Sequence, residues 1–307
     1  MTQSISIKVP ATTANVGPGF DCMGMALTLY NQFTFTPQDA GLAISVSGEG
    51  AAIIPESANN LIVKAMKYFC EAGGYPFPDV HINQVNHVPA ASGMGSSSTA
   101  VIAGLLGANG LLGFPATPDD ILQLATKMEG HPDNVAPALF GGLVVVPMDA
   151  SGEAILVERI NVPPLTVLIV LPDFQLLTSD ARAALPTEVS RADAIYNLSR
   201  TPLVVRALEQ GNYAKLGKVL DDRLHQPYRM ALIPGMADAF EAAKAAGASA
   251  ITISGAGPGS IVFAPHGHKE IGEAMIAAYA QAGLKARKWE LTLDPCGSVV
   301  NGKVYCQ

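Results

Sequence analysis

Two glycines followed by three consecutive serines stand close together in this chain, and residues of these types can bind an anion. Residues 89–99 read Pro-Ala-Ala-Ser-Gly-Met-Gly-Ser-Ser-Ser-Thr, and residues 100–106 continue as an apolar segment with helical spacing. Glycine lets the backbone turn with its N–H groups exposed, and the first turn of a helix adds unpaired N–H donors and a positive dipole end. The pattern therefore predicts a loop that binds phosphate.

Two common phosphate-binding motifs do not explain this stretch. The Walker A lysine is absent, and the sequence contains no G-x-G-x-x-G fingerprint. A glycine and serine turn before an ordinary core helix would give the same local pattern, so the loop alone leaves both explanations open. The candidate phosphate-binding residues are Pro89, Ala90, Ala91, Ser92, Gly93, Met94, Gly95, Ser96, Ser97, Ser98 and Thr99.

A second group of residues that could take part in chemistry follows a predicted helix. The residues Thr117-Pro118-Asp119-Asp120 are typical of a helix start, and this helix should end at Glu129 before a glycine. His131, Asp133 and Asn134 follow at once, so several groups that bind charge or protons gather at one helix end. A lone histidine in such a place is more often structural than a ligand.

The remaining pattern supplies the elements that must position these residues. Strands are expected at 4–9, 27–35, 42–46, 80–85, 143–146, 154–160, 165–171, 250–254, 260–264 and 288–293. Helices are expected at 61–69, capped by Asn60, and at 118–129, 178–185, 189–209 with a break at Pro202, 213–224, 236–246 and 269–282. Pro10 should end the first strand. A loop with unusual backbone conformations, of the kind that carries function, should follow at 11–21, although a simple connection between two strands would give a similar sequence. The pair Pro163-Pro164 marks a boundary, so we expect two domains, 1–160 and 161–307.

Composition narrows the function classes. The chain has 307 residues, 49% of them hydrophobic, and a formal net charge of −7, which disfavours a nucleic-acid surface. No apolar run approaches the length of a membrane span, and the first residues lack the pattern of a secretory signal. The four cysteines are scattered without a C-x-x-C, as expected of reduced thiols. We therefore expect a cytoplasmic protein with a small charged substrate, with neither nucleic acid nor membrane as a partner.

The order Pro-x-x-x-Gly-x-Gly-Ser-Ser at residues 89–97 resembles the signature loop of the GHMP kinases, a superfamily of small-molecule kinases. Met94 replaces the usual leucine, and Ser98-Thr99 replace a usual pair of alanines. Residues 11–21 and 253–258 resemble the first and third motifs of the same superfamily, in the right order. The resemblance runs from about Lys8 to the last predicted strand.

The resemblance implies an α+β fold of two domains. The N-terminal half would carry a mixed sheet and the βαβ-type nucleotide loop, and the C-terminal half would be a helix-rich α/β sandwich. ATP and Mg²⁺ are the implied cofactors, with Ser97 and Glu129 as metal ligands because Mg²⁺ prefers hard oxygen atoms. Asn60 would lie near the adenine, although a helix cap needs no ligand. A homodimer is also implied.

The segments around Arg182 and Arg229 resemble the homoserine kinase branch of the superfamily. Guanidinium groups suit the carboxylate of an amino-acid substrate, which would be L-homoserine on the route to threonine. The resemblance also implies that Asn15, Asp21 and His131 bind this substrate, that Asp133 is the nearest match to a catalytic base, and that Asn134 and Thr178 lie beside the reacting groups. Two alternatives stay open: another GHMP alcohol kinase acting on mevalonate, shikimate or an isoprenoid precursor, and a non-catalytic binding module.

Overall fold

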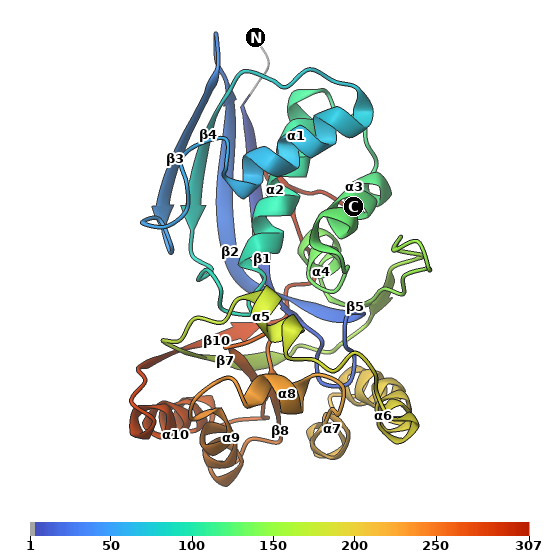
Figure 1. Ribbon diagram of the computed structural model, residues 1–307, viewed down its shortest axis with the longest axis vertical. Coiled ribbons are helices and arrows are strands. Elements are labelled where there is room, and N and C mark those ends of the chain that lie inside the picture. Colours follow the sequence, from blue (N-terminus) through green and yellow to red (C-terminus); the bar gives the residue numbers. More distant parts are fainter. Residues whose placement is uncertain (1–3, 307) are drawn as a thin grey trace.

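The computed structural model describes residues 4–306, which form two sheets with helices packed against them (Figure 1). The first is an eight-stranded sheet with the strand order β12-β11-β1-β2-β4-β3, extended by β5 and β6. Its strands are β1 (Ile5–Ala14), β2 (Met23–Pro37), β3 (Leu42–Gly48), β4 (Val80–Asn86), β5 (Leu143–Val145), β6 (Glu158–Ile160), β11 (Val299–Val300) and β12 (Lys303–Val304). Because β3 pairs with β4 in parallel and the other pairs are antiparallel, the predicted mixed sheet is confirmed.

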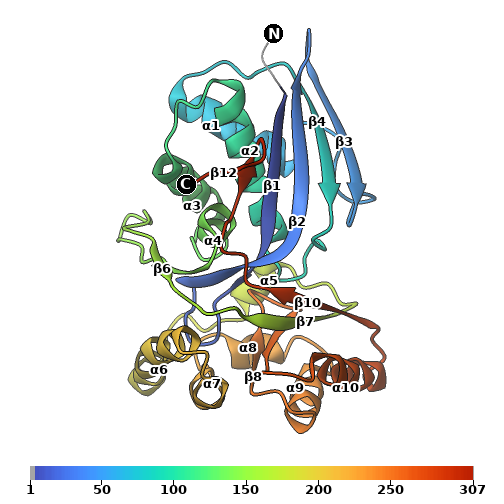
Figure 2. The ribbon, with the colours of Figure 1, turned by 180° about the vertical axis from the view of Figure 1, so that it is seen from behind.

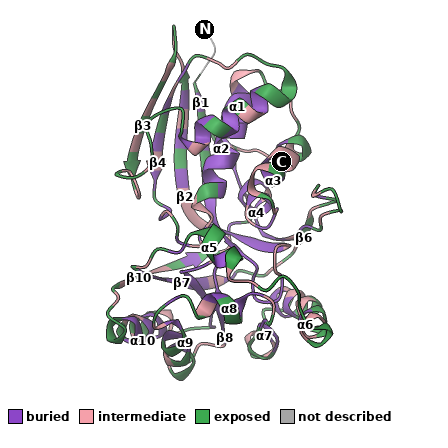
Figure 3. Ribbon diagram, viewed as in Figure 1, coloured by how far each residue is buried: buried purple, intermediate pink, exposed green. Residues whose placement is uncertain are grey.

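Four helices cover one face of this sheet: α1 (Leu61–Gly73), α2 (Ser96–Leu111), α3 (Pro118–Glu129) and α4 (Val135–Phe140). Helix α2 lies at the centre and is buried from Ser98 to Gly110 (Figure 3). A helix that is apolar on all sides belongs inside a core. The start of α2, which carries the phosphate loop, is thereby anchored to the interior of the first half.

The second sheet has the order β10-β7-β9-β8 and is fully antiparallel. Its strands are β7 (Thr166–Pro172), β8 (Ala250–Ile253), β9 (Ser260–Phe263) and β10 (Ala286–Thr292). Strand β7 is buried on both faces because Leu168 and Val170 pack toward helices α9 (Met236–Ala245) and α10 (His268–Gln281), whereas Val167 and Ile169 face the first half. The two halves therefore share a core that includes Met25 and Leu143 of the first sheet.

Four more helices complete the second half: α5 (Thr178–Ala183), α6 (Arg191–Glu209), α7 (Tyr213–Val219) and α8 (Gln226–Met230). Helix α5 lies at the junction of the two halves, and α8 packs beside strand β8 of the second sheet (Figure 1). Among the described residues, no helix has both the length and the apolar character needed to cross a bilayer.

Three local predictions are wrong. Strand β1 does not end at Pro10 but continues to Ala14, because a register shift between Pro10 and Ala11 accommodates the proline. Helix α6 passes through Pro202 without a break, since this residue lies on the exposed face, where water can satisfy the carbonyl that loses its partner. The helix expected at 213–224 ends at Val219, and α8 forms separately.

The end of the chain returns to the first half. After β10 it rises past the junction, and β11 pairs with β1 so that Val300 lies opposite Ile7 (Figure 2). The predicted second domain, 161–307, thus contributes its last strands to the first sheet. Strands of two residues leave no detectable pattern in a sequence, which explains why they were not predicted.

Candidate active site

A cavity of about 290 Å³ opens where the two halves meet. Both halves contribute to its wall, and most of the residues singled out from the sequence lie on it. These are Asn15, Asp21, Ala91, Ser92, Gly93, Gly95, Ser96, Ser97, Ser98, Glu129, His131, Asp133, Asn134, Thr178, Arg182 and Arg229. Met128, Gly255 and Ala256 also line it, and the sequence prediction of site residues did not include them.

The glycine and serine loop has a backbone suited to an anion. Gly93 and Gly95 both adopt left-handed conformations, and Gly95 is the N-cap of α2. Because glycine has no side chain to cap the helix, the N–H groups of its first turn are left without a side-chain acceptor at the cavity wall. The positive end of the α2 dipole points the same way. The loop can therefore bind the phosphates of a nucleotide without a lysine.

A second glycine-rich turn, residues 253–259, packs against this loop. The Ser254 hydroxyl donates to the carbonyl of Gly93 at 2.7 Å, and the Gly259 N–H donates to the carbonyl of Ser92 at 3.1 Å. Strand β1 holds the loop from the other side, since the N–H of Thr12 donates to the carbonyl of Met94 at 3.0 Å. The loop conformation is thus fixed by both halves of the molecule.

Glu129, at the end of α3, faces the start of α2. Its carboxylate accepts hydrogen bonds from the hydroxyls of Ser97 at 2.7 Å and Ser98 at 3.3 Å. These three groups are hard oxygen donors beside the predicted phosphate position, which is the set that Mg²⁺ prefers. The donor set therefore fits the implied metal.

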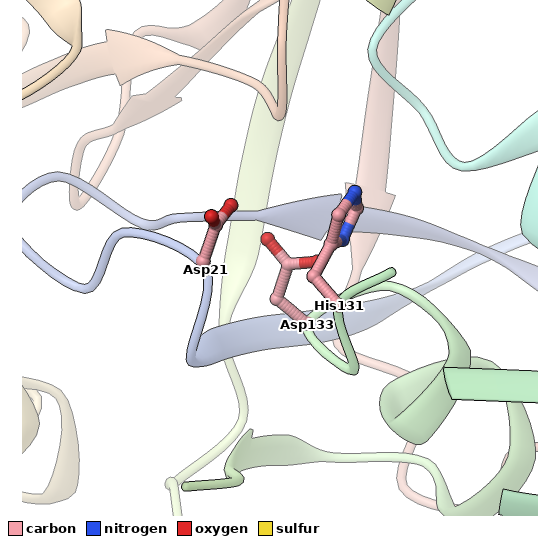
Figure 4. Close-up of side chains that lie close together, drawn as sticks. All are labelled: Asp21, His131 and Asp133. Carbon is pink, nitrogen blue, oxygen red and sulfur yellow. The ribbon is translucent and has the colours of Figure 1, made fainter. Parts of the chain in front are cut away.

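Another part of the cavity wall carries an acidic cluster that consists of Asp21, His131 and Asp133 (Figure 4). One potential ligand atom from each lies within 4.8 Å of the others. His131 Nδ1 and Asp133 Oδ1 are 2.5 Å apart, a short hydrogen bond. Burial alone would lower the pKa of His131, but the bond to Asp133 and the charges of both carboxylates raise it above its usual value. This wall carries excess negative charge and suits a cationic group.

Asn15 holds the backbone of one member of this cluster, Asp21. Its amide nitrogen donates to the carbonyl of Gly255 at 2.8 Å, and its amide oxygen accepts the N–H of Asp21 at 3.0 Å. Asn15 and Asp21 both have positive φ angles, which non-glycine residues seldom adopt. Asn15 therefore links the loop between β1 and β2 to the second glycine turn.

The two arginines occupy different environments. Arg182 is 44% exposed at its side chain and makes a bidentate pair with Asp21, with both N–O distances 2.9 Å. Arg229 is only 2% exposed, and no carboxylate of residues 4–306 lies within ion-pair distance of it. Burial lowers the pKa of Arg229, an effect that the charge of Asp21 partly offsets. The cavity thus has a buried cation ready for an anionic ligand.

Two further candidate site residues, Asn134 and Thr178, also line the cavity. The amide oxygen of Asn134 accepts a 2.7 Å hydrogen bond from the buried hydroxyl of Thr12, and its nitrogen lies 3.4 Å from Asp133 Oδ1. Thr178 is exposed at the start of α5. The sequence offered no sign of Thr12 as a partner, because 122 residues separate it from Asn134.

Five predicted nucleotide residues do not line this cavity. Pro89 and Ala90 instead line a neighbouring cavity of about 430 Å³ that shares Ala91 with the first. Met94 and Thr99 are buried. Asn60 caps α1 by accepting from the N–H of Ile62, and its nitrogen donates to Pro55 and Gln84, so all its polar atoms have partners in the protein.

Comparison with known proteins gives consistent results. The family model for the GHMP kinases N terminal domain matches residues 60–142, and the model for the GHMP kinases C terminal matches residues 204–284. The homoserine kinase of Moorella thermoacetica is 42% identical over 298 residues, covering 96% of this chain and 99% of that protein. The homoserine kinase of Nostoc sp. is 45% identical over 303 residues, covering 97% and 99%.

Solved structures agree with the sequence matches. A homoserine kinase from Cytophaga hutchinsonii superimposes with a TM-score of 0.86 at 29% identity, covering 98% of both chains. The mevalonate kinase of L. major has a TM-score of 0.69 at 15% identity, covering 94% of this chain and 95% of that one, which shows a common fold. The predicted two-domain GHMP kinase fold is confirmed.

Proposed function

The chain belongs to the homoserine kinase family of the GHMP kinases, and from this premise we propose that it transfers the γ-phosphoryl group of ATP to the side-chain hydroxyl of L-homoserine. The product is O-phospho-L-homoserine, a step on the route to threonine. The observation that carries the proposal is that one cavity joins a phosphate-binding loop to a wall offering both signs of charge.

On the nucleotide side, main-chain N–H groups of residues 93–98 hold the phosphates. Ser97 and Glu129 would hold Mg²⁺, which would supply positive charge to offset the charge that develops on the transferred phosphoryl group. The nucleoside extends past Ala91 into the neighbouring cavity lined by Pro89 and Ala90, because Ala91 lies on both walls. Asn60 supports this region only as a helix cap.

On the acceptor side, the two charged groups of an amino acid replace an ion pair between two residues of the protein. In the structure, Asp21 and Arg182 form an ion pair with each other. The ammonium group of L-homoserine takes the place of Arg182 beside Asp21, with Asn15 and His131 nearby, and its carboxylate binds Arg182 and Arg229. Asp21 and Arg182 each exchange one charged partner for another, and the buried Arg229 gains an anionic partner, which offsets part of the desolvation cost.

The hydroxyl then points toward Asp133, Asn134 and Thr178. Asp133 uses one oxygen to bind His131, so its other oxygen can accept the hydroxyl proton. Alignment of the reactants can contribute about 7–11 kcal/mol. A general base contributes typically about 10²–10⁴-fold, or about 3–5 kcal/mol. Alignment by the two walls is therefore the larger part of catalysis.

A substrate panel tests the proposal. The protein is incubated with ATP, Mg²⁺ and L-homoserine, 4-hydroxybutanoate, 3-aminopropan-1-ol, mevalonate or shikimate, and products are identified by mass spectrometry. The two homoserine analogues each lack one charged group, so each should lose at least about tenfold in kcat/KM. Failure to form phosphohomoserine would overturn the proposal, and turnover of mevalonate or shikimate instead would assign another GHMP activity. The homodimer stays a prediction from the family resemblance, and the cytoplasmic location stays a prediction from the sequence pattern.

A further inference from the structure

Arg229 owes its orientation to neutral acceptors. Its Nη1 lies 3.1 Å from the carbonyl of Gly255 and 3.4 Å from Nδ1 of His225, and its Nε lies 3.4 Å from the carbonyl of Ala181. Its Nη2 has no hydrogen-bond partner among the described residues, while the residue lines the cavity. One edge of the guanidinium is therefore anchored and the other is available to a ligand.

The partners of His225 determine which of its nitrogens carries the proton. Nε2 lies 2.9 Å from the carbonyl of Gly17 and 3.6 Å from a carboxylate oxygen of Asp222, and both oxygens can only accept. Arg229 can only donate, so Nδ1 must offer a lone pair. Burial lowers the pKa of His225, and Arg229 lowers it further against the opposing charge of Asp222. A neutral ring with its proton on Nε2 satisfies every contact.

The ring itself is held rigidly. The buried carboxylate of Asp222 accepts the N–H of His225 at 2.8 Å and that of Gln226 at 2.6 Å, which fixes the start of α8. Phe20 stacks on the His225 ring with 5.1 Å between centroids, and Arg229 lies over the same Phe20 ring at 5.2 Å. Phe20 and Gly17 belong to the loop between β1 and β2 that also carries Asp21. His225 thus connects this loop to the helix that carries Arg229.

We propose that His225, as the neutral Nε2–H tautomer, is a positioning residue that orients the Arg229 guanidinium for the carboxylate of the amino-acid substrate. The inference rests on the proposed function. His225 does not line the cavity and acts only through Arg229. The carbonyl of Gly17 keeps the proton on Nε2 of His225. The unprotonated Nδ1 can then accept a hydrogen bond from Arg229, and this bond orients the guanidinium.

Two substitutions separate these contacts. In His225→Gln, the side-chain nitrogen can replace Nε2 and donate to Gly17, but the acceptor for Arg229 is lost. In His225→Asn, the side-chain oxygen can replace Nδ1 and accept from Arg229, but the donor to Gly17 is lost. We expect His225→Gln to raise the KM for L-homoserine about tenfold, the value of one hydrogen bond to a charged group, and His225→Asn to raise it less. The KM for ATP should change little in either variant.

A double-mutant cycle completes the test. Adding His225→Gln to Arg229→Ala should raise the KM for L-homoserine no further, because the anchored group is gone. Equal increases in the KM for L-homoserine in His225→Gln and His225→Asn would overturn the inference. A parallel increase in the KM for ATP would also overturn it. If His225→Gln fails to fold, the ¹⁵N shifts of His225 in the wild-type protein decide: an unprotonated Nδ1 supports the inference and a protonated one overturns it. Wild-type inactivity toward L-homoserine would overturn the proposed function and this inference with it, whereas an active wild type with an unchanged His225→Gln KM would overturn the inference alone.

Discussion

The two walls of the cavity are built on different principles. The proposed nucleotide wall is built mainly from one stretch of chain, within residues 91–98, whose main-chain N–H groups would bind the phosphates, with Glu129 beside it. The acceptor wall consists of charged and amide side chains from separate segments, and some of them are held by partners far away in the sequence: Asp21 by Arg182, and Asn134 by Thr12. Backbone binding depends on a conformation, whereas side-chain binding depends on tertiary contacts. Substitutions in the two walls should therefore change different kinetic constants: mainly kcat for the nucleotide wall, and mainly the KM for L-homoserine for the acceptor wall.

The largest effect is expected where the glycine and serine loop packs against the second glycine turn, in Gly93→Ala. A Cβ on Gly93 would lie 2.1 Å from the carbonyl oxygen of Ser254, and its φ of +75° disfavours any side chain. Relief of this overlap needs a displacement of about 1 Å or more, and misplacement of that size costs about 100-fold in rate. Together with the left-handed strain, we expect kcat/KM to fall by about 10³-fold or more.

A matched control is Gly113→Ala, after α2. Gly113 has a φ of +84° and no atom within 4 Å of the added Cβ, so this variant carries backbone strain alone. It should lose about 1–2 kcal/mol of stability but retain activity. If both variants lost activity equally, backbone strain would explain the result, and the overlap between residue 93 and Ser254 would not.

This contrast explains what the sequence could predict. The phosphate loop was predictable because its glycines and serines are contiguous, and caps such as Asn60 and Thr117 are local signals. The pair of Arg182 with Asp21 spans 161 residues, and the sequence predicted both as site residues on resemblance without indicating that they contact each other. The continuation of β1 beyond Pro10, which brings Thr12 to Asn134, depends on a register shift that only the paired strand reveals.

The second largest effect should come from Glu129→Gln on the nucleotide wall. The amide keeps the shape of the side chain but removes the charge that would hold Mg²⁺ beside Ser97. We expect kcat to fall about 100-fold, or about 2.7 kcal/mol, and to recover partly at high Mg²⁺ concentration. Glu153→Gln, an exposed partner of Lys127, is the control and should behave as wild type. Insensitivity of the Glu129→Gln deficit to Mg²⁺ would argue against a metal ligand.

On the acceptor wall, Arg182→Ala should act mainly on one substrate. The KM for L-homoserine should rise about 10- to 100-fold, because a charge-assisted hydrogen-bond pair to the carboxylate is lost. The KM for ATP should stay within about twofold, since the loop N–H groups do not depend on this side chain. Arg206→Ala removes an exposed arginine paired with Glu209 on α6 and should change neither constant. Equal losses for both substrates would mean that Arg182 holds the walls together rather than binding the acceptor.

The smallest effect tests whether Asn60 belongs to the nucleotide wall at all. Asn60→Ala removes the cap of α1 and should lower the free energy of unfolding by about 0.5–2 kcal/mol in a urea titration. Asn60→Ser keeps an acceptor for the N–H of Ile62 and should recover much of that stability. Because every polar atom of Asn60 already has a protein partner, neither variant should change the KM for ATP in the folded enzyme. A raised KM for ATP in Asn60→Ser at nearly wild-type stability would show that the amide leaves its protein partners to contact the nucleotide, and would extend the nucleotide wall to the start of α1.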